Sequence, residues 1–239
     1  MLTFAPVVED FWQGFLAGRS LAKRPGFRLT LNPGLADDRR VVIRTLPDGT
    51  VEAALHPAAA AAVALGPDAD ESGLRAALDR EGIVLAELEH VWYYPVAERA
   101  AVEAEPLPPG LRALTDDDAE AFAAFHAANS EADRDEAFVE LDHWAVFGQF
   151  EGDQLVSVAS AYPWREAALA DIGVLTTPSA RGKGYGRAVV RAIAAHVYAQ
   201  EHEPLYRCGD ANAVSQATAR SAGMAEYCTW QTVESAEDQ

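Results

Sequence analysis

The chain of 239 residues carries a formal net charge of −18, and 49% of its residues are hydrophobic. This composition is typical of a globular protein with a sizeable core and excludes a wholly disordered chain. The negative charge argues against DNA or RNA as a main partner, because phosphates would repel it. It suits cationic partners such as polyamines, aminoglycosides or basic peptide ends, although an acidic surface more simply keeps a protein soluble.

Membrane, secretion and metal signals are missing from the sequence. No apolar run of about 18 residues occurs, so we expect no membrane-spanning helix and no membrane partner. Glu9 and Asp10 lie where a signal peptide would carry positive charge, which indicates a cytoplasmic protein. The two cysteines, Cys208 and Cys228, indicate neither a disulfide framework nor a zinc site, and we expect no metal.

Residues 1–105 predict a small α+β domain of unknown role. A helix is expected within residues 7–20, because Val8, Phe11, Trp12 and Phe15 recur at helical spacing. The turn signal Pro47-Asp48-Gly49 indicates a hairpin. The expected elements after the first helix are a strand at 27–31, hairpin strands at 41–45 and 50–55, helices at 57–65 and 71–81, and an apolar segment at 83–94.

A proline-rich segment at 103–110 reads as a linker, and a second domain is expected over residues 110–239. Thr115 and Asp118 have the spacing of a capping box at a helix start. The expected order is β-α-α-β-β-β-α-β-α-β. The strands are expected at 111–114, 144–150, 154–162, 169–176, 205–208 and 225–233. One helix is expected to run through Phe122, Phe125 and His126, and the others are expected at 132–141, 185–200 and 214–221.

A glycine-rich turn, residues 177–187, follows a predicted strand and opens a predicted helix. Such a turn presents free backbone N–H groups and the positive end of a helix dipole, which favour an anion. Its glycines let a ligand approach the backbone closely. Arg181, Lys183 and Arg187 add positive charge to an otherwise acidic protein. We therefore predict a pyrophosphate-binding turn.

Spacing excludes two common phosphate-binding motifs. A P-loop requires Gly-x-x-x-x-Gly-Lys-Ser/Thr, but Thr177 occupies the first glycine position and Gly184 follows the lysine. A dinucleotide fingerprint requires Gly-x-Gly-x-x-Gly, and counting from Gly182 or Gly184 the sixth residue is Arg187 or Val189. The pattern that remains is Arg-x-x-Gly-x-Gly.

This pattern, Arg181, Gly184 and Gly186, resembles the coenzyme A motif of the GNAT N-acetyltransferases. Asn212, with a small residue three positions later and Gly223-Met224 downstream, resembles the second signature of that family. The resemblance covers roughly residues 110–234. It implies an α+β (α/β) protein with a GNAT fold in the C-terminal part, in which helices flank a mixed, mostly antiparallel central sheet.

The resemblance also implies that acetyl-CoA is the cosubstrate and lies between the fourth and fifth strands of the GNAT domain. The backbone of the fourth strand would bond the pantetheine arm, the glycine-rich turn would hold the pyrophosphate, and Asn212 would bond the pantetheine or place the local loop. The cofactor-binding residues expected on this basis are Val174, Leu175, Thr176, Arg181, Gly182, Lys183, Gly184, Tyr185, Gly186, Arg187 and Asn212.

The catalytic groups are less clearly indicated. Many family members carry a tyrosine acid seven residues after the asparagine, but Ala219 stands there, and Ser215 is the nearest alternative donor. Asp171 lies near the position where several members keep a carboxylate, so it is the candidate base. The other groups that could reach the cleft are Asp142, His143 and, on the fifth strand, Cys208, whereas His126 is expected to be a surface or packing residue.

We therefore expect an acyltransferase that moves an acetyl group from acetyl-CoA to a primary amine by direct attack, with a small-molecule or peptide amine as acceptor. The alternative is a non-catalytic acyl-CoA-binding sensor or scaffold, which the alanine at position 219 would favour. A third possibility is that the N-terminal domain, and not the cofactor site, defines the role of the protein by supplying an acceptor lid or a dimer surface.

Overall fold

The structure is a computed structural model, and it describes residues 2–165 and 167–233. By its contacts the chain forms two compact units. The first unit contains the residues up to Val8, Trp92–Arg207 and Ala213–Ala225. The second contains Glu9–Val91, Cys208–Asn212 and the described residues from Glu226 onward.

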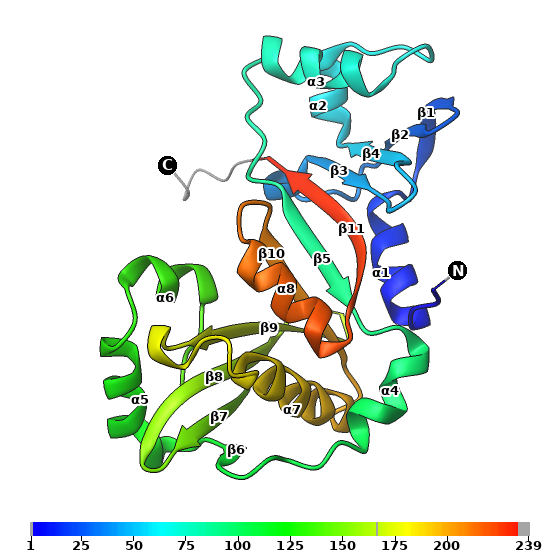
Figure 1. Cartoon of the computed structure of the whole chain (residues 1–239). Helices are drawn as coiled ribbons and strands as arrows, with labels where there is room; N and C mark the ends of the chain where they lie inside the picture. Colours follow the sequence, from blue (N-terminus) through cyan, green and yellow to red (C-terminus); the bar gives the residue numbers. More distant parts are fainter. Residues whose placement is uncertain (1, 166, 234–239) are drawn as a thin grey trace. The chain divides into compact units, whose positions relative to one another are not determined.

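The described residues form eight α-helices and eleven strands (Figure 1). The helices are α1 (Pro6–Phe15), α2 (Pro57–Val63), α3 (Glu71–Arg80), α4 (Val96–Glu103), α5 (Ala119–Ala127), α6 (Glu131–Ala137), α7 (Tyr185–Ala199) and α8 (Ala213–Ala222). The strands are β1 (Arg19–Arg24), β2 (Phe27–Leu31), β3 (Val41–Thr45), β4 (Val51–Leu55), β5 (Glu89–Tyr93), β6 (Leu111–Ala113), β7 (Ala145–Glu151), β8 (Gln154–Pro163), β9 (Leu169–Thr176), β10 (Glu203–Gly209) and β11 (Ala225–Thr232).

The strands of the first unit hydrogen-bond in the order β10-β9-β8-β7-β6. β9 runs parallel to β10, and the other neighbours are antiparallel. Gly173 approaches the end of α6 and Leu175 packs among α5 side chains, whereas Thr176 lies against Gly186 at the start of α7. Because successive strand side chains point to opposite faces, α5 and α6 cover one face of this sheet and α7 covers the other (Figure 1).

In the second unit the strands follow the order β1-β2-β4-β3-β11-β5. β2 and β4 pair in parallel, whereas the β1–β2, β3–β4 and β3–β11 pairs are antiparallel. The final strand thus pairs with residues from the first fifty, since Trp230 lies opposite Arg44. Trp12 of α1 is fully buried against Tyr227 and Trp230 of β11. A mixed, mostly antiparallel sheet flanked by helices, as predicted, is therefore confirmed.

Most predicted elements are confirmed within a few residues. The Thr115–Asp118 capping box is also present, with both reciprocal hydrogen bonds made. The first helix was predicted within residues 7–20, but α1 ends at Phe15. The chain then passes Gly18, whose φ of 139° would be strained for any other residue and whose Cβ would lie 2.2 Å from the Leu31 carbonyl oxygen. β1 begins directly after Gly18, where the backbone passes close to Leu31 of β2. The sequence pattern did not predict this strand.

The segment between α4 and β6, residues 104–110, has no regular structure among the described residues, as expected for a connection rich in proline. Glu105 within it accepts hydrogen bonds from Arg187 and Arg191 of α7. α4 was not predicted, and it begins directly after Pro95. A division into domains 1–105 and 110–239 stays a prediction, because contacts alone do not test which part folds independently.

Candidate functional site

The site is built where β9 and β10 separate. Their parallel ladder contains three residue pairs and ends where Leu205 lies opposite Asp171. Beyond this point β9 continues to pair with β8, and Val174 lies opposite Ala159. Among the described residues, no ladder pair covers the other edge of β9 from Ile172 to Thr176. This edge can therefore offer its backbone N–H and C=O groups to an extended ligand.

The glycine-rich turn lies at the end of this open edge. Gly182 and Gly184 have φ values of 79° and 85°, and Gly184 caps the N-terminus of α7. In the described part of the chain, the backbone N–H groups of residues 182–187 donate to no other backbone group. α7 has 15 residues, so the positive end of its dipole reinforces these donors. The turn therefore combines two glycines with positive φ and a set of backbone N–H groups that are available to an anion, as anion binding at a helix N-terminus requires.

Three cationic side chains surround the turn, and each is paired with a carboxylate. The pairs are Arg181–Asp133 at 3.2 Å, Lys183–Glu151 at 2.8 Å and Arg187–Glu105 at 3.1 Å. Exposed pairs of this kind contribute little to stability, so an incoming anion can replace the carboxylates. Glu151 raises the pKa of Lys183, and Lys183 lowers the pKa of Glu151, so both remain charged at neutral pH.

These observations fit a diphosphate group. The donors, the two glycines with positive φ and the three cations lie within seven residues of sequence, directly after the open edge of β9. An ideal Cβ at Gly186 would lie 3.5 Å from side-chain atoms of Thr176 and Thr218, which is an ordinary van der Waals contact. The predicted residues Val174–Thr176 and Arg181–Arg187 are therefore brought together by the fold.

Asp171, the predicted base, lies at the last β9–β10 pair and is 5% exposed. Its Oδ2 atom accepts hydrogen bonds from Tyr162 Oη at 3.0 Å and from Arg207 Nε and Nη2 at 3.0 and 2.6 Å. Burial and the Asp171 charge raise the pKa of Tyr162. The carboxylate therefore ties β8, β9 and β10 together at the point of separation, and its role as a base stays a prediction.

His143 lies near Asp171, on the same face of the sheet. Its Nδ1 atom is 2.8 Å from Ser160 Oγ, and its ring packs against Phe138 and Tyr162 at centroid distances of 5.1 and 5.0 Å. Burial lowers the pKa of His143, so the imidazole is neutral at neutral pH. His126 instead bonds the carbonyl of Val139 at 3.1 Å, which fits a packing role.

The predicted acid, Ser215, lies in the first turn of α8. Its Oγ atom is 2.7 Å from Tyr206 Oη, a contact that sequence reasoning missed because the two residues lie on different elements. Ala219 has no exposed surface. Asn212 and Cys208 belong to the second unit, and their predicted roles at the cofactor stay predictions.

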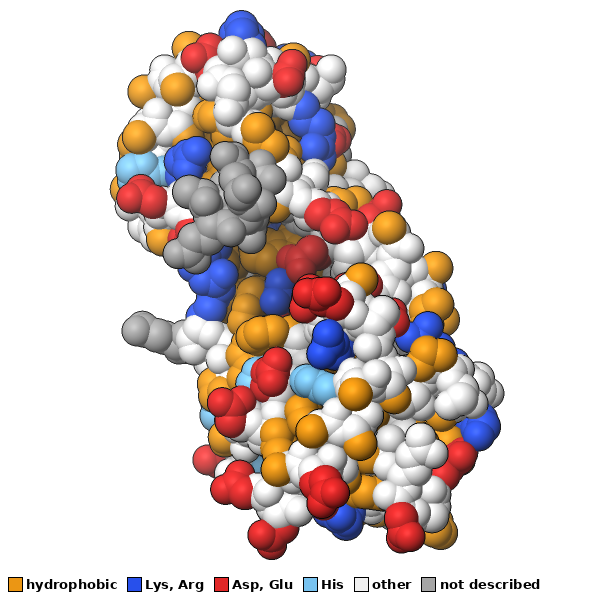
Figure 2. Space-filling view, turned by 90° about the vertical axis from the view of Figure 1, so that its left-hand side faces the viewer, with side chains coloured by type: hydrophobic (Ala, Val, Ile, Leu, Met, Phe, Trp, Pro, Cys, Tyr) orange, Lys and Arg blue, Asp and Glu red, His pale blue; other side chains and the backbone are white. Residues whose placement is uncertain are grey.

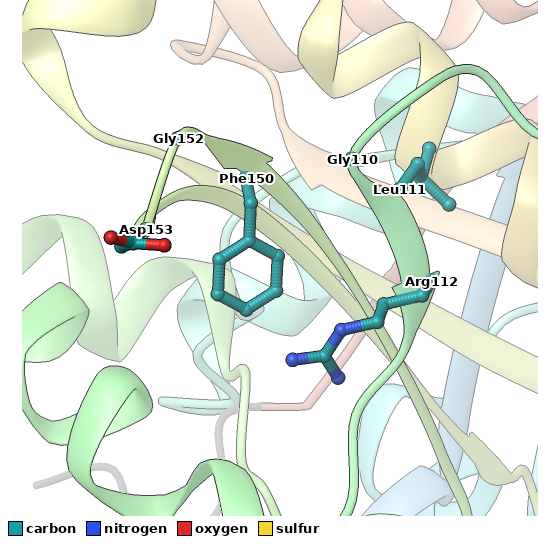
Figure 3. Close-up of a pocket in the computed structure, with 6 residues that line it drawn as sticks. All are labelled: Gly110, Leu111, Arg112, Phe150, Gly152 and Asp153. Atoms are coloured by element: carbon teal, nitrogen blue, oxygen red, sulfur yellow. The ribbon is translucent and has the colours of Figure 1, made fainter.

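A surface hollow of about 420 Å³ lies elsewhere on the first unit, beside β6 and the β7–β8 turn (Figure 3). Arg112 stacks on Phe150 at 4.6 Å and forms a bidentate pair with Asp118. That pair lowers the pKa of Asp118 to about 2. None of the residues predicted for chemistry lines the hollow, and Arg112, one of its two charged lining residues, is engaged with Phe150 and with the capping residue Asp118. The residues that line it are Gly110, Leu111, Arg112, Phe150, Gly152 and Asp153.

Acidic and basic side chains are interspersed on the face drawn in Figure 2, so that face shows no single charged patch. Among the described residues, no group of three or more His, Cys, Asp or Glu side chains could hold a metal ion. No helix in the described part of the chain is long and apolar enough to cross a membrane.

Gly173 shows how closely α6 approaches the site. An ideal Cβ at this position would lie 2.2 Å from the carbonyl oxygen of Ala137, a backbone atom. We expect Gly173→Ala to lower the free energy of unfolding by about 1–3 kcal/mol, because the strand or the helix end must shift. Urea unfolding measures this change. Gly14→Ala in α1 is the control, since nothing lies within 4 Å of its Cβ, and a similar loss in both variants would contradict the close approach.

Comparisons with known proteins show the family and the fold of the chain. A family model described as acetyltransferase (GNAT) domain matches residues 89–225, more than half of the 239 residues. No curated protein matches the sequence. An acetyltransferase of the GNAT family from Colwellia psychrerythraea is 17% identical, with a TM-score of 0.50, over 70% of this chain and 63% of that chain.

Two further solved structures are similar over part of the chain. An acetyltransferase of the GNAT family from Novosphingobium aromaticivorans is 19% identical, with a TM-score of 0.46, over 62% of this chain and 64% of that one. A ribosomal-protein-alanine N-acetyltransferase from Brucella melitensis is 21% identical, with a TM-score of 0.41, over 52% of this chain and 99% of that chain. This chain spans less than two thirds of the Colwellia and Novosphingobium proteins, and at such identities the likeness concerns the fold.

Proposed function

Because the chain belongs to the GNAT acetyltransferase family, we propose that it transfers an acetyl group from acetyl-CoA to a primary amine by direct attack. The main observation in support of this proposal is the glycine-rich turn, whose backbone N–H groups at residues 182–187 lie at the end of the open edge of β9 and donate to no other backbone group in the described part of the chain. The acceptor is a small-molecule or peptide amine. This choice, a homodimeric state and a cytoplasmic location stay predictions from the sequence.

The chain's own residues would hold the donor in two places. The backbone of Val174–Thr176 would bond the pantetheine arm as an added strand, and the N–H groups of residues 182–187 would hold the pyrophosphate. Arg181, Lys183 and Arg187 would exchange their carboxylate partners for phosphate oxygens. Asn212 stays a further predicted contact. Bound acetyl-CoA supplies a thioester, which is an acyl group activated for attack by an amine.

The protein must also place the acceptor and remove a proton from its nitrogen. Two groups lie on the α5–α6 face of the sheet, beside the point where β9 and β10 separate. The Asp171 carboxylate accepts hydrogen bonds from Tyr162 and Arg207. The lowered pKa of His143 keeps its imidazole neutral and able to accept a proton. Both side chains are therefore candidates, and Asp171 remains the base predicted from the sequence.

A second candidate function is a sensor or scaffold that binds acyl-CoA without turnover. The observation that favours it is Ala219, which is fully buried at the position where many relatives carry a tyrosine acid. Nothing else in the described residues favours this alternative over an enzyme.

Release of free thiol from acetyl-CoA tests the proposed function. Polyamines, aminoglycosides and peptides with free N-termini are offered as acceptors, and coenzyme A binding is measured in parallel by calorimetry. We expect binding, together with thiol release that depends on one class of amine. Clear binding without turnover on any amine would favour the sensor, and absence of binding would contradict both candidates.

A further inference from the structure

We propose that Tyr206 is the proton donor to the departing sulfur, in place of the tyrosine that is absent at position 219. The inference rests on the proposed function, because it assumes that the thioester lies where β9 and β10 separate. The sequence predicts Ser215 for this step, and the structure adds Tyr206 of β10 as its hydrogen-bonding partner.

Tyr206 occupies the first position of β10 after the strands part. The last ladder pair joins Leu205 to Asp171, and Tyr206 is the next residue along β10. Its neighbour Arg207 bonds Asp171 on the face covered by α5 and α6. Since successive side chains alternate, Tyr206 points to the opposite face, where it meets α8. Its phenol therefore lies beside the opening in which a thioester carried along β9 would end.

The contacts of the Tyr206 hydroxyl suit a proton relay. Tyr206 is 1% exposed, and its Oη atom is 2.7 Å from Ser215 Oγ. Ser215 is only half-buried, in the first turn of α8, so its hydroxyl can exchange protons with solvent. Ala219, one turn further along α8, has a methyl group that cannot donate a proton. Tyr206 and Ser215 thus place two hydroxyl groups on the side of the sheet from which the family's usual acid would come.

The step balances in atoms and protons. The acceptor nitrogen bonds to the carbonyl carbon, the carbon–sulfur bond breaks, and the sulfur leaves with the electron pair. Tyr206 Oη gives its proton to that sulfur and regains one through the hydroxyl of Ser215. The amine loses one proton in the same turnover, so the net reaction yields an amide and a free thiol.

The test compares wild type with Tyr206→Phe, which keeps the ring and removes the hydroxyl. With acetyl-CoA we expect kcat to fall by about 10- to 100-fold. This is at or below the lower end of the usual range for general acid catalysis, because the coenzyme A thiolate is a good enough leaving group to depart partly unassisted. Acetyl-CoA affinity, measured by calorimetry, should stay within about twofold. With an acetyl thioester of an aromatic thiol, whose thiolate leaves without a proton, the two proteins should react at similar rates.

Tyr227→Phe is the matched control, since it removes another buried phenol hydroxyl, bonded to Glu9 at 2.9 Å in the second unit. We expect it to leave kcat with acetyl-CoA near the wild-type value. An equal loss of rate in Tyr206→Phe with both thioesters would indicate a packing role and overturn the inference, as would an unchanged kcat. If wild type itself released no thiol with any amine, the proposed function would fail first and the inference with it.

Discussion

Replacing Gly184 with Asp should weaken acetyl-CoA binding by 100-fold or more, about 2.8 kcal/mol. The backbone at Gly184 has a φ of 85° and forms the N-cap of α7, beside donors that no described backbone group uses. An aspartate there would set a negative charge against the pyrophosphate and could itself occupy the free N–H groups. Calorimetric titration with acetyl-CoA measures the loss.

Gly184→Asn separates charge from shape in this experiment. Asparagine has nearly the same size as aspartate and tolerates positive φ better than most residues, so we expect a smaller loss than for the aspartate. No atom lies within 4 Å of an ideal Cβ at this position, and both side chains carry the backbone strain of a φ of 85°, so the difference between the two variants reports the charge. Equal dissociation constants for the two variants, or binding like wild type in both, would show that the turn does not contact the pyrophosphate.

The glycine-rich turn could be predicted because its determinants are local. Glycine spacing, a preceding strand and a following helix are all contained in residues 169–200, and the structure has β9 and α7 there as expected. The hairpin formed by β7 and β8 was predicted for the same reason, since a turn signal separates two apolar runs. Local patterns therefore identified the elements that carry the cofactor-binding residues.

What could not be predicted depends on pairing between distant residues. β1 has one buried side chain, Ala22, so its sequence lacks the alternation of a half-buried strand, and main-chain pairing with β2 defines it. The Asp171–Arg207 pair joins residues 36 positions apart. The Tyr206–Ser215 contact requires knowing both where β10 leaves β9 and how α8 packs. Tyr206 could therefore not be identified as an acid candidate from the sequence, because its position beside Ser215 depends on both elements.

The largest loss of stability is expected from Glu52→Ala in the second unit. Glu52 and Arg44 lie opposite each other on β4 and β3, and they are 5% and 3% exposed. Glu52 Oε2 accepts from Arg44 Nε at 2.8 Å and Nη2 at 2.6 Å, and Oε1 lies 3.2 Å from Arg28 Nη1. Burial alone would lower the pKa of Arg44, but the charges of Tyr227 and Glu52 raise it by more. The net pKa lies above the usual value, so the guanidinium stays charged.

Removing Glu52 would leave that buried charge without its main partner, so the free energy of unfolding should fall by about 3–5 kcal/mol in urea titrations. Glu103→Ala is the matched control, because its pair with Arg99 is exposed on both sides and should contribute only about 0.3–0.5 kcal/mol. The double variant Arg44→Met, Glu52→Leu should recover most of the loss, since apolar replacement removes the desolvated charge as well as the pair. A Glu52→Ala loss below about 1 kcal/mol would mean that water reaches Arg44 and that the pair is not buried in solution.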